Sequence, residues 1–439
     1  MILHRARTLL PLLLLLLLAT ACQSPTPNLV DEAARSKIEL AIREGATHLD
    51  LSGIELVAIP PEIGQATALT HLDVSHNRLT ALPPEIGKLS ALMDLDISRN
   101  QITRLPPEIG QLSNLKLLFA YDNKLESLPV EIGGLQKLLV LDLDQNPLTG
   151  LPNELAQLGS LNSLELCQTR LQQFPSQIAQ LPNLRVLNLC ANGLREFPPA
   201  ILGMTGLTNL GLQDNTIAEL PPGIGGLTQL RSLSLDGNNL TRVPAEIGQL
   251  QELRLLGLGK NRLTSLPPEI GQLKELQWLN LGQNDLTSLP PEIGQLTKLE
   301  TLYIYGNGLT SLPPEIGYLA HLKTLTAFSN RLTALPADIG RLFSLTELNL
   351  SMNQLSELPP EIGQLATLEE LDLAHNGLVK LPAQIGNLAN LIELDLSSNR
   401  LIALPSQMGQ MAKLKQLDIR DNPIEEMPRV LPEGVTILR

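Results

Sequence analysis

The stretch NRLTSLPPEIGQL (residues 261–273) belongs to a pattern that returns every 23 residues. The full unit reads L-x-x-L-x-L-x-x-N-x-L-x-x-L-P-x-x-I-G-x-L-x-x, and seventeen copies follow one another without a change of period. Fifteen copies carry asparagine at the same position: Asn77, Asn100, Asn123, Asn146, Asn192, Asn215, Asn238, Asn261, Asn284, Asn307, Asn330, Asn353, Asn376, Asn399 and Asn422. The other two copies have Ile54 and Thr169 there. A fixed period of this length with regular leucines indicates a solenoid of stacked coils.

Each unit has a simple physical interpretation. In residues 69–77 apolar and polar residues alternate, which predicts a short half-buried strand with Leu72 and Val74 facing inward. The positions six, four and two residues before the asparagine are expected to face outward. The amide of Asn77 can donate and accept hydrogen bonds, so it can satisfy backbone groups at the turn. The following Pro-Pro-Glu (83–85) suits the start of a short helical or 3₁₀ segment.

One unit cannot bury its leucines alone, so the copies must stack. The sequence predicts an α/β solenoid, with a parallel sheet on the concave face and short helical or 3₁₀ segments on the convex face. The unit resembles the leucine-rich repeats, and specifically the 23-residue subclass of Ras-pathway scaffold proteins and plant disease-resistance proteins. The resemblance covers about residues 46–439. It implies a horseshoe fold and a protein-binding role without naming a partner.

The amino terminus has the features of an export signal. Arg5 and Arg7 precede a leucine-rich run (9–18) that is about half as long as a membrane-spanning helix requires. The sequence Ala-Thr-Ala-Cys (19–22) resembles the bacterial lipobox, which implies that Cys22 is lipidated and anchors the protein to a membrane. An ordinary secretory signal cleaved nearby is the alternative. Gln23 follows the cysteine, which by the family rule implies an outer-membrane or cell-surface lipoprotein of a bacterial envelope.

The predicted organisation has five parts. Residues 1–21 are a lipoprotein-type signal peptide, and 22–28 form a tether. Residues 29–45 form a capping helix, 46–428 are the repeats, and 429–439 are a truncated carboxy-terminal cap. Terminal caps cover the open edges of a solenoid.

Charge restricts the class of partner. The chain has a net charge of −13. Removing residues 1–21, which carry two arginines and no acid, gives −13 − 2 = −15. An acidic surface argues against nucleic-acid binding. It favours a basic partner, or it serves solubility alone.

Aromatic residues are concentrated on the predicted outward positions, which are 3 of every 23 residues. The chain has ten aromatic residues, so an even distribution would place one or two there. Six are found: Phe119, Tyr121, Trp278, Tyr303, Tyr305 and Phe328. The last four come from three consecutive units and should lie close together, which predicts a protein-binding site. Phe119 and Tyr121 form a second, smaller patch. The alternative is that aromatic residues merely favour strands.

Carboxylates occupy the same outward positions further along the chain. They are Glu347, Glu370, Asp372, Glu393, Asp395 and Asp418. A basic partner or a bound cation would relieve their mutual repulsion, whereas plain solvation is the alternative. We expect the first five to form a secondary acidic surface.

Cysteine and histidine pairs also follow the period. Cys167 and Cys190 share one outward position in consecutive units, and the spacing of neighbouring strands permits a disulfide. His48 and His71 share another, each near an aspartate. Because the repeat alone explains that spacing, we expect solvated side chains and no metal site.

The sequence therefore predicts a non-catalytic module that binds a protein or peptide on its concave face and needs no cofactor. No nucleophile, phosphate loop or metal cluster stands apart from the repeat. Two alternatives remain open at this stage: an intracellular signalling scaffold of a small-GTPase or kinase pathway, and a purely structural envelope protein.

Overall fold

The computed structural model describes residues 27–429 and 431–439. It divides into two compact units. Unit 1 comprises the chain up to Leu164 together with Gln180–Pro182, and unit 2 comprises Glu165–Ala179 and Asn183–Arg439. The predicted signal peptide, Cys22 and most of the predicted tether lie outside the described residues.

Each copy of the repeat contributes one three-residue strand. Unit 1 contains β1 (His48–Asp50), β2 (His71–Asp73), β3 (Asp94–Asp96), β4 (Leu117–Phe119) and β5 (Val140–Asp142). Strand β6 (Ser163–Glu165) crosses the division. Unit 2 contains β7 (Val186–Asn188), β8 (Asn209–Gly211), β9 (Ser232–Ser234), β10 (Leu255–Gly257), β11 (Trp278–Asn280), β12 (Thr301–Tyr303), β13 (Thr324–Thr326), β14 (Glu347–Asn349), β15 (Glu370–Asp372), β16 (Glu393–Asp395), β17 (Gln416–Asp418) and β18 (Thr436–Leu438).

The return segments are short 3₁₀ helices, most of which begin directly after a proline. They are η2 (Pro61–Gln65), η3 (Pro84–Lys88), η4 (Pro107–Gln111), η5 (Val130–Gly134), η6 (Asn153–Gln157), η7 (Ser176–Gln180), η8 (Pro199–Gly203), η9 (Pro222–Gly226), η10 (Ala245–Gln249), η11 (Pro268–Gln272), η12 (Pro291–Gln295), η13 (Pro314–Tyr318), η14 (Ala337–Arg341), η15 (Pro360–Gln364), η16 (Ala383–Asn387) and η17 (Ser406–Gln410). Proline and an early glutamate favour the first turn, as the sequence predicted.

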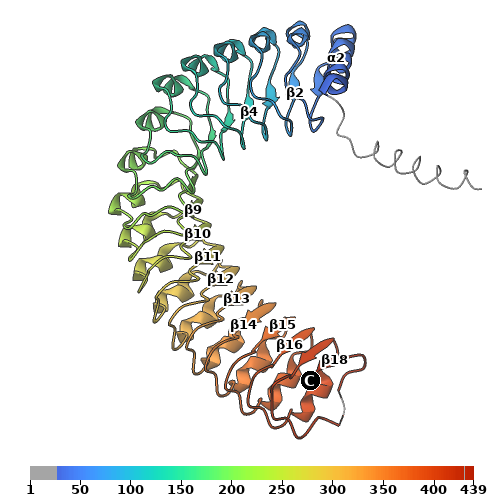
Figure 1. Cartoon of the computed structure of the whole chain (residues 1–439). Coiled ribbons are helices and arrows are strands. Elements are labelled where there is room, and N and C mark those ends of the chain that lie inside the picture. Colours follow the sequence, from blue (N-terminus) through green and yellow to red (C-terminus); the bar gives the residue numbers. More distant parts are fainter. Residues whose placement is uncertain (1–26, 430) are drawn as a thin grey trace, which may run out of the picture. The chain divides into compact units, whose positions relative to one another are not determined.

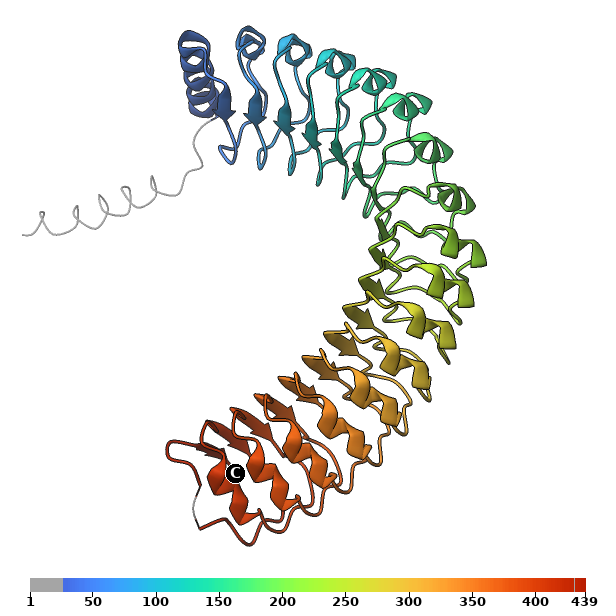
Figure 2. The ribbon, with the colours of Figure 1, turned by 180° about the vertical axis from the view of Figure 1, so that it is seen from behind.

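Within each unit the strands pair in parallel along the concave side, and the 3₁₀ helices follow the convex side (Figure 1). Figure 2 shows the same arrangement from behind. Residues 23 apart are direct partners, so Leu256 faces Leu279 and Leu279 faces Leu302. The predicted α/β solenoid is confirmed. We call each 23-residue copy a coil, and the side of the sheet that faces away from the core the strand face.

The core is a set of apolar columns that run from coil to coil. In one coil Leu256, Leu258, Leu263, Ile270 and Leu273 are all fully buried. Because every coil repeats these positions, each leucine packs against its equivalents in the coils before and after it. The buried apolar surface is the main favourable term for stability.

The repeated asparagine satisfies the turn of its own coil and the strand end of the coil before it. The side-chain amide of Asn261 donates to the carbonyl oxygens of Leu258 (3.0 Å) and, one coil back, Leu235 (2.9 Å). Its oxygen accepts the N–H of Leu240 at 3.0 Å. The preceding residue, Lys260, has a φ of 51°. A left-handed backbone at a non-glycine residue is unfavourable, so these bonds also hold the turn in a strained shape.

Thr169 performs only part of this role. Its backbone N–H donates to the side-chain oxygen of Asn192 at 3.1 Å, and its hydroxyl donates to the same oxygen. A threonine has no second donor with which to reach the preceding coil. The division between the two units falls in the coil that carries this substitution.

Both ends of the described chain are capped. Helix α2 (Pro27–Glu44) packs on β1 and η2 with Ala34 and Ile38 fully buried, and Gly45 ends it with a φ of 62°. The helix begins within the segment predicted as a tether. At the other end β18 pairs with β17, and Gln416 is the partner of Thr436.

The strand face is narrower than the sequence predicted. Each strand includes the positions six and four residues before the asparagine, whereas the position two residues before it lies beyond the strand. Small side chains at this last position, such as Ser75 and Ser98, are 5% and 0% exposed. The expectation that Ser75 faces solvent is therefore wrong, because the chain already turns inward toward the asparagine there.

The glycine of the Ile-Gly pair is required by close packing between 3₁₀ helices. A Cβ on Gly271 would lie 2.6 Å from the carbonyl oxygen of Glu292 in the next coil. In one coil Leu202 replaces this glycine. The residue 21 positions later is then Gly223, whereas most coils have glutamate there. A Cβ on Gly223 would lie 2.7 Å from the Leu202 side chain, so the leucine occupies the space that the missing side chain leaves.

We predict that Gly271→Ala lowers the free energy of unfolding by about 1–3 kcal/mol, because the added methyl group must displace a backbone carbonyl. Gly226→Ala is the control, since a Cβ there meets nothing within 4 Å. It should be neutral or slightly stabilising. Urea unfolding followed by circular dichroism compares the two midpoints, and equal midpoints would contradict the packing explanation.

Candidate protein-binding site

Four aromatic side chains meet on the strand face of unit 2; we call Trp278, Tyr303, Tyr305 and Phe328 the aromatic cluster. Trp278 meets Tyr303 edge to face, with ring centroids 6.0 Å apart. Tyr303 and Tyr305 are 6.4 Å apart, and Tyr305 stacks on Phe328 at 4.8 Å with an interplanar angle of 7°. The structure thus brings together the four residues that the sequence placed on consecutive units.

A glycine gives Tyr305 its orientation. A Cβ on Gly282 would collide with the Tyr305 ring, so the ring covers the bare backbone of the preceding coil. All four rings are half-buried because they cover one another. By contrast, Tyr318 and Phe343 on the convex side are 54% and 61% exposed. The cluster is therefore a pre-ordered apolar surface.

The acidic surface follows the aromatic cluster along the same face. Strand pairing places Glu347, Glu370 and Glu393 in one column. Asp372, Asp395 and Asp418 form the column beside it. Burial raises the pKa of Glu370, and repulsion from Glu347 and Glu393 raises it further. Burial likewise raises the pKa of Asp372, although the N–H of Ala374 donates to it.

Asp418 differs because it has a cationic partner. The Arg420 side chain donates to both carboxylate oxygens, at 3.0 Å from Nε to each. This pairing holds the pKa of Asp418 below its ordinary value. The acidic column thus ends in a neutralised pair, and the uncompensated charge lies between Glu347 and Asp395.

In unit 1 the second aromatic patch is half-buried and already has a partner. The guanidinium of Arg99 lies 5.6 Å from the ring centroid of Tyr121. Phe119 borders a cavity of about 340 Å³ that is also lined by His48, His71, Asp50, Asp73, Asp94 and Asp96. The two histidine rings stack with centroids 4.1 Å apart. Among the described residues no group of three or more histidine, cysteine, aspartate or glutamate side chains is arranged to hold a metal ion.

Cys167 and Cys190 form a disulfide in unit 2, with Cα atoms 4.5 Å apart. The bond joins the coil that carries Thr169, to which Cys167 belongs, to the following coil, to which Cys190 belongs. It therefore cross-links the coils where the asparagine bonding is incomplete.

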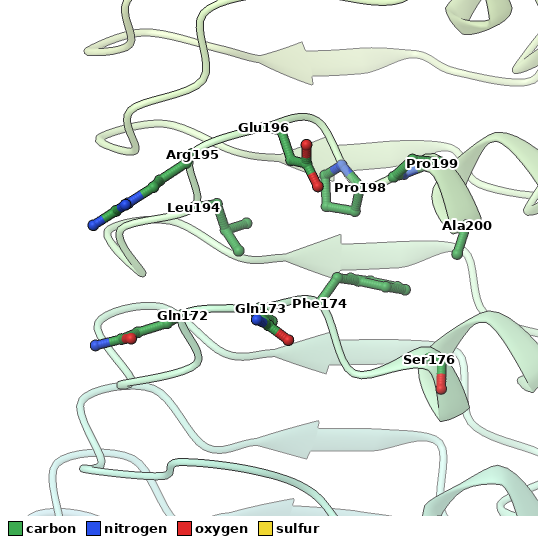
Figure 3. Close-up of a pocket in the computed structure, with 10 residues that line it drawn as sticks. All are labelled: Gln172, Gln173, Phe174, Ser176, Leu194, Arg195, Glu196, Pro198, Pro199 and Ala200. Carbon is green, nitrogen blue, oxygen red and sulfur yellow. The ribbon is translucent and has the colours of Figure 1, made fainter.

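A pocket of about 570 Å³ lies on the flank of two neighbouring coils of unit 2 (Figure 3). Phe174, Leu194 and Pro198 form its apolar lining, and Gln172, Gln173, Arg195 and Glu196 its polar lining. The sequence analysis did not predict this pocket. One signal was present in the sequence, because Phe174, which lines the pocket, stands where most coils carry leucine before the proline.

Comparison with known proteins identifies the class. A leucine-rich repeat region model matches residues 242–333 and 336–431, and a second leucine-rich repeat model matches residues 67–125 and 182–240. A leucine-rich repeat protein of Leptospira interrogans is 42% identical, with 83% of this chain and 93% of that protein aligned and a TM-score of 0.80. The chain belongs to the leucine-rich repeat proteins.

Two plant receptors share the fold. The ectodomain of the Arabidopsis thaliana membrane receptor kinase GASSHO1/SCHENGEN3, solved with CASPARIAN STRIP INTEGRITY FACTOR 2, is 31% identical. The alignment covers 85% of this chain and 51% of that one, with a TM-score of 0.68. The Arabidopsis receptor kinase HAESA, solved with the peptide hormone IDA, is 26% identical over 87% of this chain and 75% of its own, with a TM-score of 0.64. No curated protein matches in sequence.

Within residues 27–429 and 431–439, no helix is both long and apolar enough to span a membrane.

The opposite pKa shifts predict opposite pH effects on stability. Glu370 has a raised folded-state pKa, so its stabilising contribution is present below about pH 4.5 and lost as pH rises through the folded value. Glu370→Gln should raise stability at pH 7 by ~0.5 kcal/mol or less and have no effect at pH 3.

Asp418 has a lowered folded-state pKa, so its contribution is present above about pH 3.8 and lost as pH falls through the folded value. Asp418→Asn should therefore lower stability at pH 7. Thermal unfolding between pH 3 and 7 tests both variants, and shifts of the same sign at pH 7 would contradict the assignment.

Proposed function

We propose that this protein is a non-catalytic binding module, exported and lipid-anchored at a bacterial envelope, that holds a protein or peptide on the strand face of unit 2. The observation that carries the proposal is the aromatic cluster. Trp278, Tyr303, Tyr305 and Phe328 are the primary contact residues. Phe119 and Tyr121 are a secondary contact.

The physical argument rests on desolvation and rigidity. Aromatic side chains provide large apolar contact areas, and aromatic residues are frequent among the residues that dominate binding energy. Here the rings already hold one another in place. Little side-chain entropy is therefore lost when a partner covers them, which favours binding.

Charge defines the partner's chemistry. The acidic surface of Glu347, Glu370, Asp372, Glu393 and Asp395 follows the cluster without a break in the strand series. A partner with an apolar segment and basic residues beside it complements both surfaces. Oppositely charged surfaces accelerate encounter and set orientation.

The relatives support a protein or peptide as the ligand. GASSHO1/SCHENGEN3 and HAESA were each solved with a bound factor or peptide hormone. The Leptospira protein supports a bacterial setting. Export and lipidation rest on the sequence of residues 1–22, namely the basic start, the leucine run and the lipobox-like Ala-Thr-Ala-Cys.

We predict that Trp278→Ala/Tyr303→Ala weakens partner capture at least tenfold, because the two rings are the anchors of the contact. The immobilised protein is exposed to envelope and host extracts, and bound proteins are quantified by mass spectrometry. The matched control is the separate variant Tyr318→Ala/Phe343→Ala. It removes two aromatic side chains of the convex side, which are more exposed than those of the cluster.

A partner that is lost from the first variant and kept by the control supports the proposal. A partner captured equally by both variants would move the site away from the cluster. Circular dichroism verifies that both variants fold. No capture by any form would favour a purely structural role in the envelope.

Lipidation gives a separate prediction. Expressed in a bacterium fed labelled palmitate, the protein should incorporate label and sediment with membranes, whereas Cys22→Ser should lose the label and become soluble. Cys167→Ser/Cys190→Ser, in which Cys22 is the only remaining cysteine, should stay labelled. Unprocessed cytosolic protein would instead revive the intracellular scaffold alternative.

A further inference from the structure

One coil of unit 2 carries glycine at two of its three outward positions. In β10 and the residues after it, the outward positions four and two residues before Asn261 are Gly257 and Gly259. The coils on either side carry Asp236 and Asn280. The side-chain amide of Asn280 donates to Oδ1 of Asp236 at 2.8 Å, although the two residues are 44 positions apart.

Both glycines are necessary for this bridge. A Cβ on Gly257 would collide with Oδ2 of Asp236, and one on Gly259 would lie 2.5 Å from the Asn280 amide. The two polar side chains therefore lie flat across the backbone of the glycine coil.

The bridge fixes the orientation of a carboxylate. Oδ1 of Asp236 accepts both the Gly259 N–H, at 2.8 Å, and the Asn280 amide. Oδ2 accepts the Ser234 hydroxyl at 3.2 Å. None of the ion pairs among the described residues includes Asp236. Burial raises the pKa of Asp236 in spite of these bonds.

Asn280, which donates to this carboxylate, shares strand β11 with the first residue of the aromatic cluster. Trp278 lies two residues before Asn280 on β11, so both side chains point to the strand face. On one side Trp278 contacts Tyr303, and on the other its strand partner is Leu255, which is 44% exposed. A carboxylate beside an indole is a suitable setting for a cation, because the indole face attracts positive charge.

The outward positions of the neighbouring coils hold no basic residue that could pair with Asp236. From Ser232 to Ser397 the outward positions include six carboxylates and no lysine or arginine. Asp236 lies on one side of the aromatic cluster, and the acidic surface lies on the other.

We propose that Asp236 and Trp278 bind a lysine or arginine side chain of the partner peptide, with the carboxylate forming the ion pair and the indole covering the alkyl chain and the charged group. This inference rests on the proposed function and specifies which residue of the ligand is recognised first. Asn280, Gly257 and Gly259 are positioning residues that hold the carboxylate flat.

The test uses a defined probe. A random 12-residue phage-displayed peptide library is selected on the full chain and counter-selected on Trp278→Ala/Tyr303→Ala. The best peptide is synthesised with its basic residues and also with each one replaced by citrulline (for arginine) or norleucine (for lysine). Dissociation constants come from the fluorescence anisotropy of labelled peptide.

Asp236→Asn keeps an oxygen to accept the Gly259 and Asn280 bonds but removes the charge. It should weaken binding at least tenfold with an unchanged urea midpoint. Asp214→Asn, which changes net charge equally at an exposed turn one coil away, should change binding less than twofold. Among the peptides with one basic residue replaced, one should bind wild type about tenfold more weakly than the parent peptide. The affinity of this peptide should not fall further when Asp236→Asn is tested.

The inference is overturned, and the proposed function left intact, if the selected peptide binds Asp236→Asn within twofold of its affinity for wild type. The same conclusion follows if the affinity losses caused by Asp236→Asn and by neutralising the peptide simply add. If no selected peptide distinguishes wild type from Trp278→Ala/Tyr303→Ala, the proposed function fails, and the inference fails with it.

Discussion

The asparagine amide is the interaction on which the rest of this structure depends. Each turn bends through a left-handed residue and leaves carbonyl groups that the short strands cannot pair. The amide of Asn261 satisfies carbonyl groups in two coils, and its oxygen receives an N–H from the preceding one. An unsatisfied buried polar group costs about 1–3 kcal/mol, so a change in coil length would carry that cost at its turn. This is a physical reason for the period to remain at 23 residues.

A constant period turns the strand face into columns. Side chains 23 positions apart are direct neighbours, so a pair of similar residues in consecutive coils becomes a contact. The same rule yields the stacked histidines, the disulfide, the repelling glutamates and the aromatic cluster. Most columns hold small or polar residues, and the aromatic cluster is where the columns depart from this pattern. Carboxylates flank the aromatic residues on both sides, which gives this face a consistent chemical character.

The sequence was sufficient for much of this account because the period makes distance predictable. The stacking of the coils, the short strands, the 3₁₀ returns and the meeting of Trp278 with its aromatic neighbours all follow from counting residues. The inward turn at Ser75 did not follow, because the strand ends earlier than the alternating pattern. Neither did the pairing of Leu202 with Gly223 or the bridge from Asp236 to Asn280. These depend on how far a side chain reaches into a neighbouring coil, and a single-coil pattern does not contain that information.

The central claim is that the strand face around Trp278 receives a ligand, and the chain offers a direct probe because Trp278 is its single tryptophan. The most direct measurement is a titration of the full chain with its captured partner while the intrinsic tryptophan emission is recorded. The account predicts a saturating change in emission that follows the binding isotherm obtained by sedimentation. A partner that binds by sedimentation and leaves the emission of Trp278 unchanged would contradict it.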